Sequence, residues 1–432
     1  MDSQTAFPAG LRRTLTHRVT AAELAPVAAL LGSADPALAP RAAATLMTRM
    51  LVTRFPGPGT RLLRENFSYA GRLAEGDELE LSVEVAGAAP GGLALRCTVR
   101  LAGGETILEG VADVVPPAAR PAEDADTPFG VTPRRMITAL LERCHGRAPV
   151  PTAVAHPCDA ASLEGALLAA RHGLITPILV GPEARIRRAA AEASLDIAGL
   201  EIVGAPHSHA SAEAAVGLVS DGNARALMKG SLHTDELLSA ALAREAGLRT
   251  ERRVSHAFVM DAPLYPRLLI ITDAAINIAP DLEAKADIVR NAIALASAIG
   301  IELPRVALLS AVETVTPRMA STLEAAALCK MADRGQITGG ILDGPLAFDN
   351  AVSEAAAQAK GIVSAVAGRA DILVVPDIES GNMLAKQLAL LGGAESAGIV
   401  LGLRVPMALT SRSDDAMSRL ASAALLRLMA EG

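Results

Sequence analysis

Residues 409–416, with the sequence LTSRSDDA, place a hydroxyl, a guanidinium and two adjacent carboxylates within five positions. They follow the apolar run GIVLGLRVPMA, which is typical of a strand. A guanidinium can bind phosphate through its planar fork, and a carboxylate can accept a proton during a reaction. A structural interpretation is also open, because Ser411 or Asp414 could cap the helix predicted from AMSRLASAALLRLMA.

A second polar group follows the short strand-like run RALMKG. Lys229 is one of five lysines in the chain and precedes Gly230, so its ammonium could reach an anion at the strand end. A solvated loop lysine would fit the same position. His233 and Thr234 could contact phosphate or could cap the helix predicted over DELLSAALAREA.

Other apolar runs end in similar small or polar clusters, TDAAINIAP, DGPLAFDNA and PDIESGN. Glycines in such loops allow close backbone approach to a ligand, and the N–H groups that open helices bind anions. Several such endings together indicate one cleft that binds a phosphate group. Its further candidate residues, each of which could instead order a turn, are Asn277, Asp343 and Asn382.

For these residues to form one site, the ends of the strands that precede them must lie close together. From ASLEGALLAARHGL onward, helical and strand-like segments alternate, which predicts a parallel sheet covered by helices on both faces. A second set of strands follows, including RLLIITD, PRVALLS and ADILVVPD. Two such sheets side by side would leave a cleft, and ligands in α/β folds bind at the carboxyl ends of strands.

The first 115 residues have a different pattern. One apolar helix is predicted over PRAAATLMTRMLVTRF, and strands separated by GAAPGG and AGGE predict an antiparallel meander that wraps it. The stretch from Val114 to Thr132 is rich in proline, alanine and acids, so we expect a linker at 116–135. The chain of 432 residues is long enough for more than one core.

Composition and missing motifs exclude several classes of protein. The net charge of −7 and the absence of a basic run argue against nucleic-acid binding. No GxGxxG or P-loop is present, and the four scattered cysteines form no CxxC pair, so we expect neither a nucleotide cofactor nor a metal. No signal peptide or membrane-spanning run is recognisable, which favours the cytoplasm.

The motifs LMKGSLHTDELL, ITDAAINIAPDLEAKADIVRNA, GILDGPLAFDNAVS, ADILVVPDIESGNMLAKQL and VPMALTSRSD resemble the phosphate acetyl/butyryltransferase family in order and spacing. The resemblance runs from about residue 137 to the end, and the LTSR ending is more similar to the phosphotransbutyrylase branch. It implies an isocitrate/isopropylmalate dehydrogenase-like α/β fold with an interdomain cleft. The implied subdomains are residues 136–262 plus 396–432, and residues 263–395.

The family resemblance implies the reaction acyl-CoA plus phosphate giving acyl phosphate plus CoA, by direct transfer without a cofactor. Acetyl-CoA is the expected substrate, with propionyl- or butyryl-CoA as alternatives. The resemblance assigns Asp414 as the base for the CoA thiol, Ser411 as the hydrogen-bond donor and Arg412 as the phosphate clamp. Lys229, Gly230, His233 and Thr234, with the three residues of the other loops, would bind phosphate or CoA.

One assignment stays open, and two positions depart from the family pattern. Asp415 could exchange roles with Asp414, because the acetyl branch places its aspartate further along; otherwise it is a first-turn acid of the following helix. Ser239 stands where the acetyl branch carries an arginine. Ala385 replaces a frequent tyrosine, which either enlarges the acyl pocket or has no effect.

The first 115 residues resemble the MaoC-like hotdog domain of enoyl-CoA hydratases, chiefly in PGPGTRLLRENFSYAGRLAEGDELELSVEV. The hydratase motif would fall on GSADPALAP, where Ser33 and Leu38 replace the aspartate and the histidine. Neither residue can handle the proton or activate water. We therefore expect no hydratase activity, and a role in assembly or in binding a regulatory acyl-CoA.

Two other functions are compatible with parts of the pattern. A non-catalytic acyl-CoA sensor would need the same binding loops but not Ser411, Arg412 and Asp414. A metal- and NAD-dependent decarboxylating dehydrogenase of related fold would need clustered acids or histidines, which the sequence lacks. A homo-oligomer is expected, because both resembled families usually dimerise.

Overall fold

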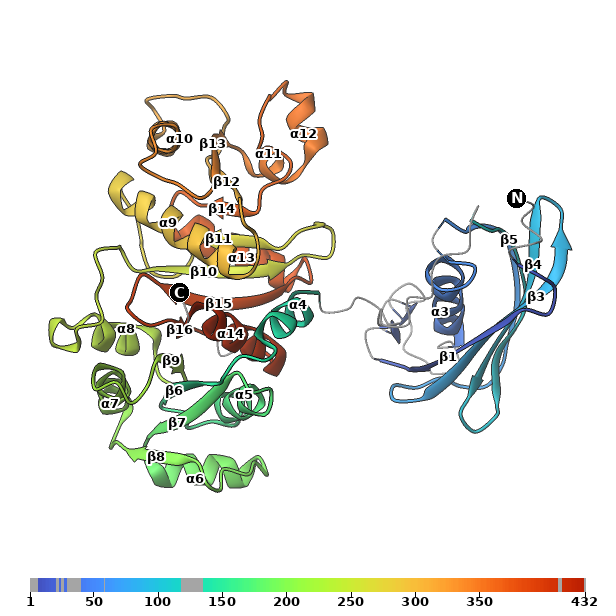
Figure 1. Cartoon of the computed structure of the whole chain (residues 1–432), viewed down its shortest axis with the longest axis horizontal. Helices are drawn as coiled ribbons and strands as arrows, with labels where there is room; N and C mark the ends of the chain where they lie inside the picture. The colour runs from blue at the N-terminus through green and yellow to red at the C-terminus, as the bar shows by residue number, and fades with distance from the viewer. Residues whose placement is uncertain are drawn as a thin grey trace. The chain divides into compact units, whose positions relative to one another are not determined.

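The computed structural model describes residues 7–20, 23–24, 27–28, 40–57, 59–117, 135–410 and 414–430. The chain divides into two compact units, Met1–Pro133 and Arg134–Gly432 (Figure 1). Gly32, Ser33, Pro36 and Leu38 of the hydratase comparison lie outside the described residues, as do Ser411 and Arg412.

In its described residues, the first unit has an antiparallel sheet packed against a long helix, as predicted. Apolar residues alternate with polar ones along its strands, so one face is apolar. Helix α3 (Pro40–Thr53) lies against the sheet and buries Leu46, Met47 and Met50 (Figure 1). The strand order is β1-β3-β4-β5-β2, with strands β1 (Arg12–Arg18), β2 (Arg61–Tyr69), β3 (Glu78–Ala89), β4 (Gly92–Leu101) and β5 (Thr106–Val115).

The second unit begins with alternating helices and strands, because apolar runs of strand length are separated by alanine-rich amphipathic segments. Its first half contains α4 (Arg135–Cys144), β6 (Val150–Ala155), α5 (Ala160–Arg171), β7 (Ile175–Gly181), α6 (Glu183–Glu192), β8 (Glu201–Gly204), α7 (Ser208–Ser220), β9 (Ala226–Lys229), α8 (Thr234–Leu242) and the 3-10 turn η1 (Arg244–Ala246).

The remainder of the second unit continues the same sheet. Its elements are β10 (Ser255–Asp261), β11 (Leu269–Thr272), α9 (Leu282–Ala298), β12 (Arg305–Leu309), α10 (Ala320–Asp333), β13 (Ile341–Leu346), α11 (Phe348–Val352), α12 (Glu354–Ala359), β14 (Ile372–Val374), α13 (Ile378–Leu390), β15 (Glu395–Leu401), β16 (Met407–Ala408) and α14 (Ala416–Met429).

Within the described residues, the second unit has one continuous sheet of eleven strands, in the order β13-β12-β14-β11-β10-β15-β16-β9-β6-β7-β8. The predicted α/β fold is confirmed, but the two groups of parallel strands do not form separate sheets. They are joined by β10 and β15, which pair antiparallel with each other, and β10 also pairs antiparallel with β11. The strand β10 was not predicted from the sequence, and neither was this junction.

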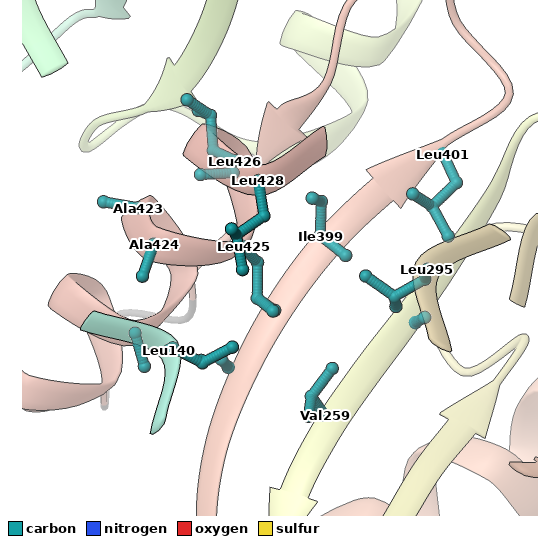
Figure 2. Packing of buried hydrophobic residues seen from close by; sticks show 14 of the residues in the cluster. Leu140, Val259, Leu295, Ile399, Leu401, Ala423, Ala424, Leu425, Leu426 and Leu428 are labelled. Atoms are coloured by element: carbon teal, nitrogen blue, oxygen red, sulfur yellow. The ribbon is translucent and has the colours of Figure 1, made fainter. Parts of the chain in front are cut away.

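The two faces of this sheet are packed differently. One face carries a single core that runs across both halves and is covered by α4, α5, α9 and α14. Figure 2 shows Leu140, Val259, Leu295 and Ile399 of this core together with leucines of α14. On the other face the apolar residues form two clusters. Cluster A lies over β6–β9 beneath α7 and α8, and cluster B lies over β11–β14 beneath α11–α13.

Candidate functional site

The side chain of Lys229 links two neighbouring strand ends. Strands β9 and β16 run parallel, with Met407 opposite Leu227 and Ala408 opposite Met228. Lys229, at the end of β9, is 5% exposed, and its Nζ donates to the carbonyl oxygens of Gly230 and Thr410, both at 3.4 Å. Thr410 directly precedes Ser411. The structure therefore brings Lys229 beside the start of the Ser411–Asp415 segment, although Ser411 and Arg412 themselves are outside the described residues.

Gly230 is required by the close packing of β9 on β6. A Cβ at this position would overlap the carbonyl oxygen of Ala155 and would lie 2.6 Å from that of His156. The Gly230 N–H donates to the Ala155 oxygen at 2.9 Å, which holds the two strand ends together. The described contacts of Gly230 thus explain its identity by packing, and its predicted ligand contact stays a prediction.

His233 and Thr234 lie at the start of α8, as the capping interpretation expected. The His233 backbone N–H donates to Glu236 Oε2 at 3.1 Å. Glu236 also accepts from the Ser208 hydroxyl at 2.9 Å and forms an ion pair with His209 at 3.2 Å. Although its slight burial acts in the opposite direction, these hydrogen bonds lower the pKa of Glu236. The helix start is therefore held by a local network of polar side chains.

The two adjacent aspartates have different environments. Asp415 is the N-cap of α14, and its Oδ1 accepts from the Ser418 N–H at 2.7 Å. Asp414 is half-buried one position earlier, and its carbonyl oxygen accepts from Arg419 Nε at 3.3 Å. Arg419 also donates to the Thr410 hydroxyl at 2.9 Å, which ties α14 to the strand end that carries Lys229. The capping role thus falls to Asp415.

The loop after β11 is organised around a buried carboxylate that the sequence analysis did not select. Asp273 is 2% exposed and accepts from the backbone N–H groups of Ala275, Ile276 and Asn277 at 3.0–3.1 Å. Burial raises the pKa of Asp273 despite these hydrogen bonds. The signal in the sequence was TDAAIN, in which an aspartate can accept from N–H groups of the following turn.

Asn277 and Asn382 support this same loop. Asn277 Nδ2 donates to Asp273 Oδ2 at 2.5 Å and to the Val254 carbonyl oxygen at 2.9 Å, while its Oδ1 accepts from Arg253 Nε at 2.8 Å. Asn382 Nδ2 donates to the Ala274 carbonyl oxygen at 3.1 Å. These contacts are those of turn-ordering residues, which was the structural alternative for both.

The predicted site residues fall into groups at different strands of the sheet. The ends of β9 and β11 are four strand spacings apart, about 19 Å. Asp343 lies on β13, the edge strand, seven spacings or about 34 Å from β9, and its Oδ1 accepts from the Gly344 N–H at 2.8 Å. Ile276, in the loop after β11, packs against cluster A, which contains Leu237 of α8. The loop of Asn277 therefore packs against the same apolar cluster as α8. Asp343 is not brought near Lys229.

His156, at the end of β6, is a further polar residue that the sequence analysis did not select. It has a φ of 55°, is 4% exposed, and its carbonyl oxygen accepts from Ser231 N–H and Oγ at 2.9 and 2.8 Å. Its Nδ1 lies 2.9 Å from Ser211 Oγ, and that hydroxyl donates to the His207 carbonyl oxygen at 2.8 Å. Burial, aided by Arg185, lowers the pKa of His156, so a neutral imidazole stands one strand from Lys229.

Three of the four cysteines are poorly suited to act as nucleophiles. Burial raises the pKa of Cys97 and of Cys329 to about 12 and also raises the pKa of Cys158. Because only the thiolate is nucleophilic, these thiols are unreactive near pH 7. In the part of the chain that the structure describes, no cluster of three His, Cys, Asp or Glu side chains is arranged to hold a metal ion. Its helices include none with the length and apolarity needed to cross a membrane.

Ala385 and Ser239, the two positions that depart from the family pattern, lie in the core and at the surface, respectively. Ala385, on the buried side of α13, is 3% exposed and belongs to cluster B, so it fills core space. Ser239 lies on α8 and lines a surface hollow of about 450 Å³ together with Glu236 and His209.

The chain is similar to several known proteins. The family model for phosphate acetyl/butaryl transferase matches residues 207–426. A phosphate acetyltransferase from Rhizobium meliloti is 62% identical over 291 residues, 67% of this chain and 92% of the relative. A phosphate butyryltransferase from Clostridium acetobutylicum is 44% identical over 296 residues, 68% of this chain and 98% of the relative. Among solved structures, a branched-chain phosphotransacylase from Enterococcus faecalis V583 is 32% identical, with a TM-score of 0.57, over 65% of this chain and 99% of that one.

Proposed function

Because the chain belongs to the phosphate acetyl/butyryl transferase family, we propose that it transfers a short acyl group between CoA and inorganic phosphate. Acetyl-CoA is the preferred substrate, since the phosphate acetyltransferase relative is 62% identical and the butyryltransferase relative 44%. Propionyl- and butyryl-CoA are the alternatives.

The observation that carries this proposal is the contact between Lys229 and Thr410. It joins the cationic end of β9 to the residue that precedes the Ser-Arg-Ser-Asp segment. The ammonium of Lys229 and the guanidinium of Arg412 would bind the phosphate, since both donate charge-assisted hydrogen bonds to its oxygens. A phosphate at this edge also lies near the N-terminal end of α8, where the helix dipole favours an anion.

When acyl phosphate reacts with CoA, Asp414 takes the thiol proton and the sulfur forms a bond to the carbonyl carbon. The bond between that carbon and the phosphate oxygen breaks, and phosphate leaves with the electron pair. Ser411 donates a hydrogen bond to the sulfur or to the carbonyl oxygen. We assign the proton to Asp414 rather than Asp415 because the Asp415 carboxylate caps α14.

No cofactor or metal is required for this chemistry, because thioester and acyl phosphate are both activated acyl donors. CoA and phosphate are thus substrates. For the first unit, with Ser33 and Leu38 at the hydratase positions, the proposal is assembly or regulatory binding of an acyl-CoA rather than hydration. We propose that the first domain comprises residues 1–115 and that a linker joins it to the transferase domain at 136–432. We further propose that the protein is a homo-oligomer in the cytoplasm.

The test is release of free CoA from acetyl-, propionyl- and butyryl-CoA on addition of phosphate, followed with a thiol reagent in the presence of a chelator. We expect phosphate-dependent release that is fastest with acetyl-CoA. Folded protein that releases no thiol from any of the three would contradict the proposal and support the acyl-CoA sensor.

A further inference from the structure

A histidine lies at the boundary between clusters A and B. Val254, which directly precedes β10, belongs to cluster A, and Met260 of β10 belongs to cluster B. Because side chains alternate along a strand, His256 and Phe258 point to the same face between them. The opposite face of β10 contributes Ala257 and Val259 to the continuous core (Figure 2).

The imidazole of His256 is completely buried and has no hydrogen-bond partner. The residue is 0% exposed, and neither Nδ1 nor Nε2 has a partner in the structure. A buried polar group without a partner costs roughly 1–3 kcal/mol, so an apolar side chain would be the more stable choice at this position. An unpaired buried group of this kind requires an explanation, and a catalytic role is one of those known.

The neighbours of the imidazole leave room for it and connect it to the proposed site. Gly398 on β15 lies beside the ring, where a Cβ would be only 3.0 Å from Nε2. The carbonyl oxygen of Gly398 accepts from the Leu409 N–H at 3.2 Å. His256 and Gly398 thus lie on the neighbouring strands β10 and β15, and Leu409 directly follows the next strand, β16, two residues before Ser411.

Phe258 forms the side of this position that reaches solvent. Its ring centroid is 4.5 Å from that of His256 at an interplanar angle of 74°, and the residue is partly exposed. The Phe258 ring therefore packs directly against the imidazole. Because His256 is 0% exposed, a group that reaches it at the boundary between clusters A and B requires movement of the neighbouring side chains.

A buried, neutral imidazole can stabilise a developing negative charge through its N–H group. Burial lowers the pKa of His256 to about 3, so the ring is neutral at the pH of the cell. A neutral imidazole carries one N–H donor and no charge. The carbonyl oxygen of an acyl group gains negative charge while the acyl group is transferred, and a fixed donor in a water-poor site stabilises that charge.

We propose that the His256 N–H donates a hydrogen bond to the carbonyl oxygen of the acyl group during transfer, which makes His256 a catalytic residue. This inference rests on the proposed acyl transfer. As the phosphate oxygen or the sulfur adds to the carbonyl carbon, the π electrons move to the carbonyl oxygen and the His256 hydrogen bond shortens. As the leaving group departs with its electron pair, the C=O bond re-forms. The imidazole keeps its proton throughout.

The test compares His256→Leu, His256→Gln and the control Met260→Leu in the full chain, with acetyl-CoA and phosphate. His256→Leu should lower kcat by about 100-fold or more, as loss of one oxyanion donor does, with KM for phosphate unchanged. Its thermal midpoint should be equal to or above that of the wild type, because an unpaired polar group is removed. His256→Gln, whose amide can donate near the Nε2 position, should recover about 10-fold of that loss or more.

Met260→Leu repacks the same face of the same strand and should retain wild-type kcat. A fully active His256→Leu would overturn the proposal, as would a His256→Leu with a clearly lowered thermal midpoint, since the imidazole would then be structural. Equal losses in His256→Gln and His256→Leu would also overturn it. A wild-type protein without acyl transfer would instead refute the proposed function, so the two failures are distinguishable.

Discussion

At the scale of single residues, the side chains of the site are of two kinds. Some stabilise the backbone through hydrogen bonds, and others have contacts that are compatible with a chemical role. Asp415, Asn277 and Asn382 hold a helix start and a loop through hydrogen bonds within the chain. Lys229 instead lies at a strand end against Thr410. His256 is buried with neither ring nitrogen paired. Substitutions of these residues should therefore affect different quantities, stability for the first group and kinetics for the second.

The two aspartates form a matched pair for mutation. Asp414→Asn should lower kcat by about 100-fold or more, because an amide cannot accept the thiol proton. Asp415→Ala should keep most of kcat but lose about 1 kcal/mol of stability, because α14 loses its N-cap. Steady-state kinetics and thermal melts of both variants check this; the reverse pattern would assign the base to Asp415.

Lys229 is predicted to act on phosphate binding. Lys229→Met keeps the apolar stem but removes the ammonium, so KM for phosphate should rise about 10-fold or more while KM for acetyl-CoA changes little. Lys330→Met is the control, since this lysine is exposed and pairs with Asp333 at 2.6 Å on α10. Equal KM values for phosphate in the wild type and Lys229→Met would remove Lys229 from the phosphate site.

The buried imidazole also predicts a pH dependence of stability. The pKa of His256 is lowered from 6.5 to about 3, so between these values the unfolded chain binds a proton that the folded chain does not. Stability is therefore fully present above pH 6.5 and is lost as the pH falls. Between pH 7 and pH 5, the wild type should lose about 2 kcal/mol more than His256→Leu, measured by denaturant unfolding of both proteins. Parallel losses would show that His256 is accessible to protons.

At the scale of elements, the site depends on how closely neighbouring strand ends can approach. Strands β6 and β9 can end side by side because position 230 has no side chain, and β16 pairs in parallel with β9. Helices α5 and α8 begin just beyond the ends of β6 and β9. The strand ends thus fix the positions of Lys229 and Thr410 before any ligand binds.

Gly230→Ala should destabilise the second unit by about 2 kcal/mol or more and reduce activity, because a Cβ would overlap two carbonyl oxygens of β6. The matched control is Gly217→Ala within α7, where nothing lies within 4 Å of the added Cβ. This control should gain roughly 0.5–1 kcal/mol, since alanine favours the helix. Thermal melts and the thiol assay distinguish the two; a stable and active Gly230→Ala would contradict the packing argument.

At the scale of the whole molecule, the two halves of the second unit share one core on one face of the sheet and carry separate clusters on the other. Separation of the halves would expose the shared core, so they should unfold together. On the other face of the sheet, the boundary between clusters A and B separates the packing of the two halves.

The first unit gives a prediction for the complete chain. Ser33 and Leu38 cannot replace the carboxylate and imidazole of a hydratase, so the protein should not hydrate crotonyl-CoA. The measurement is loss of the enoyl thioester absorbance, with acetyl transfer in the same preparation as the control for folded protein. A hydration rate above background would refute the assignment of these two positions.

The sequence by itself determined most of the local elements, the contrast between a helix-plus-meander unit and an α/β unit, and the family, because periodicity and motif order are local properties of the chain. It could not determine strand partners. The antiparallel junction through β10, the distance of Asp343 from Lys229, and the capping role of Asp415 depend on which segments pair across the sheet. Only the tertiary structure decided that His256, which in the sequence is one polar residue in an apolar strand, is buried without a partner, because burial is set by segments far away in the chain.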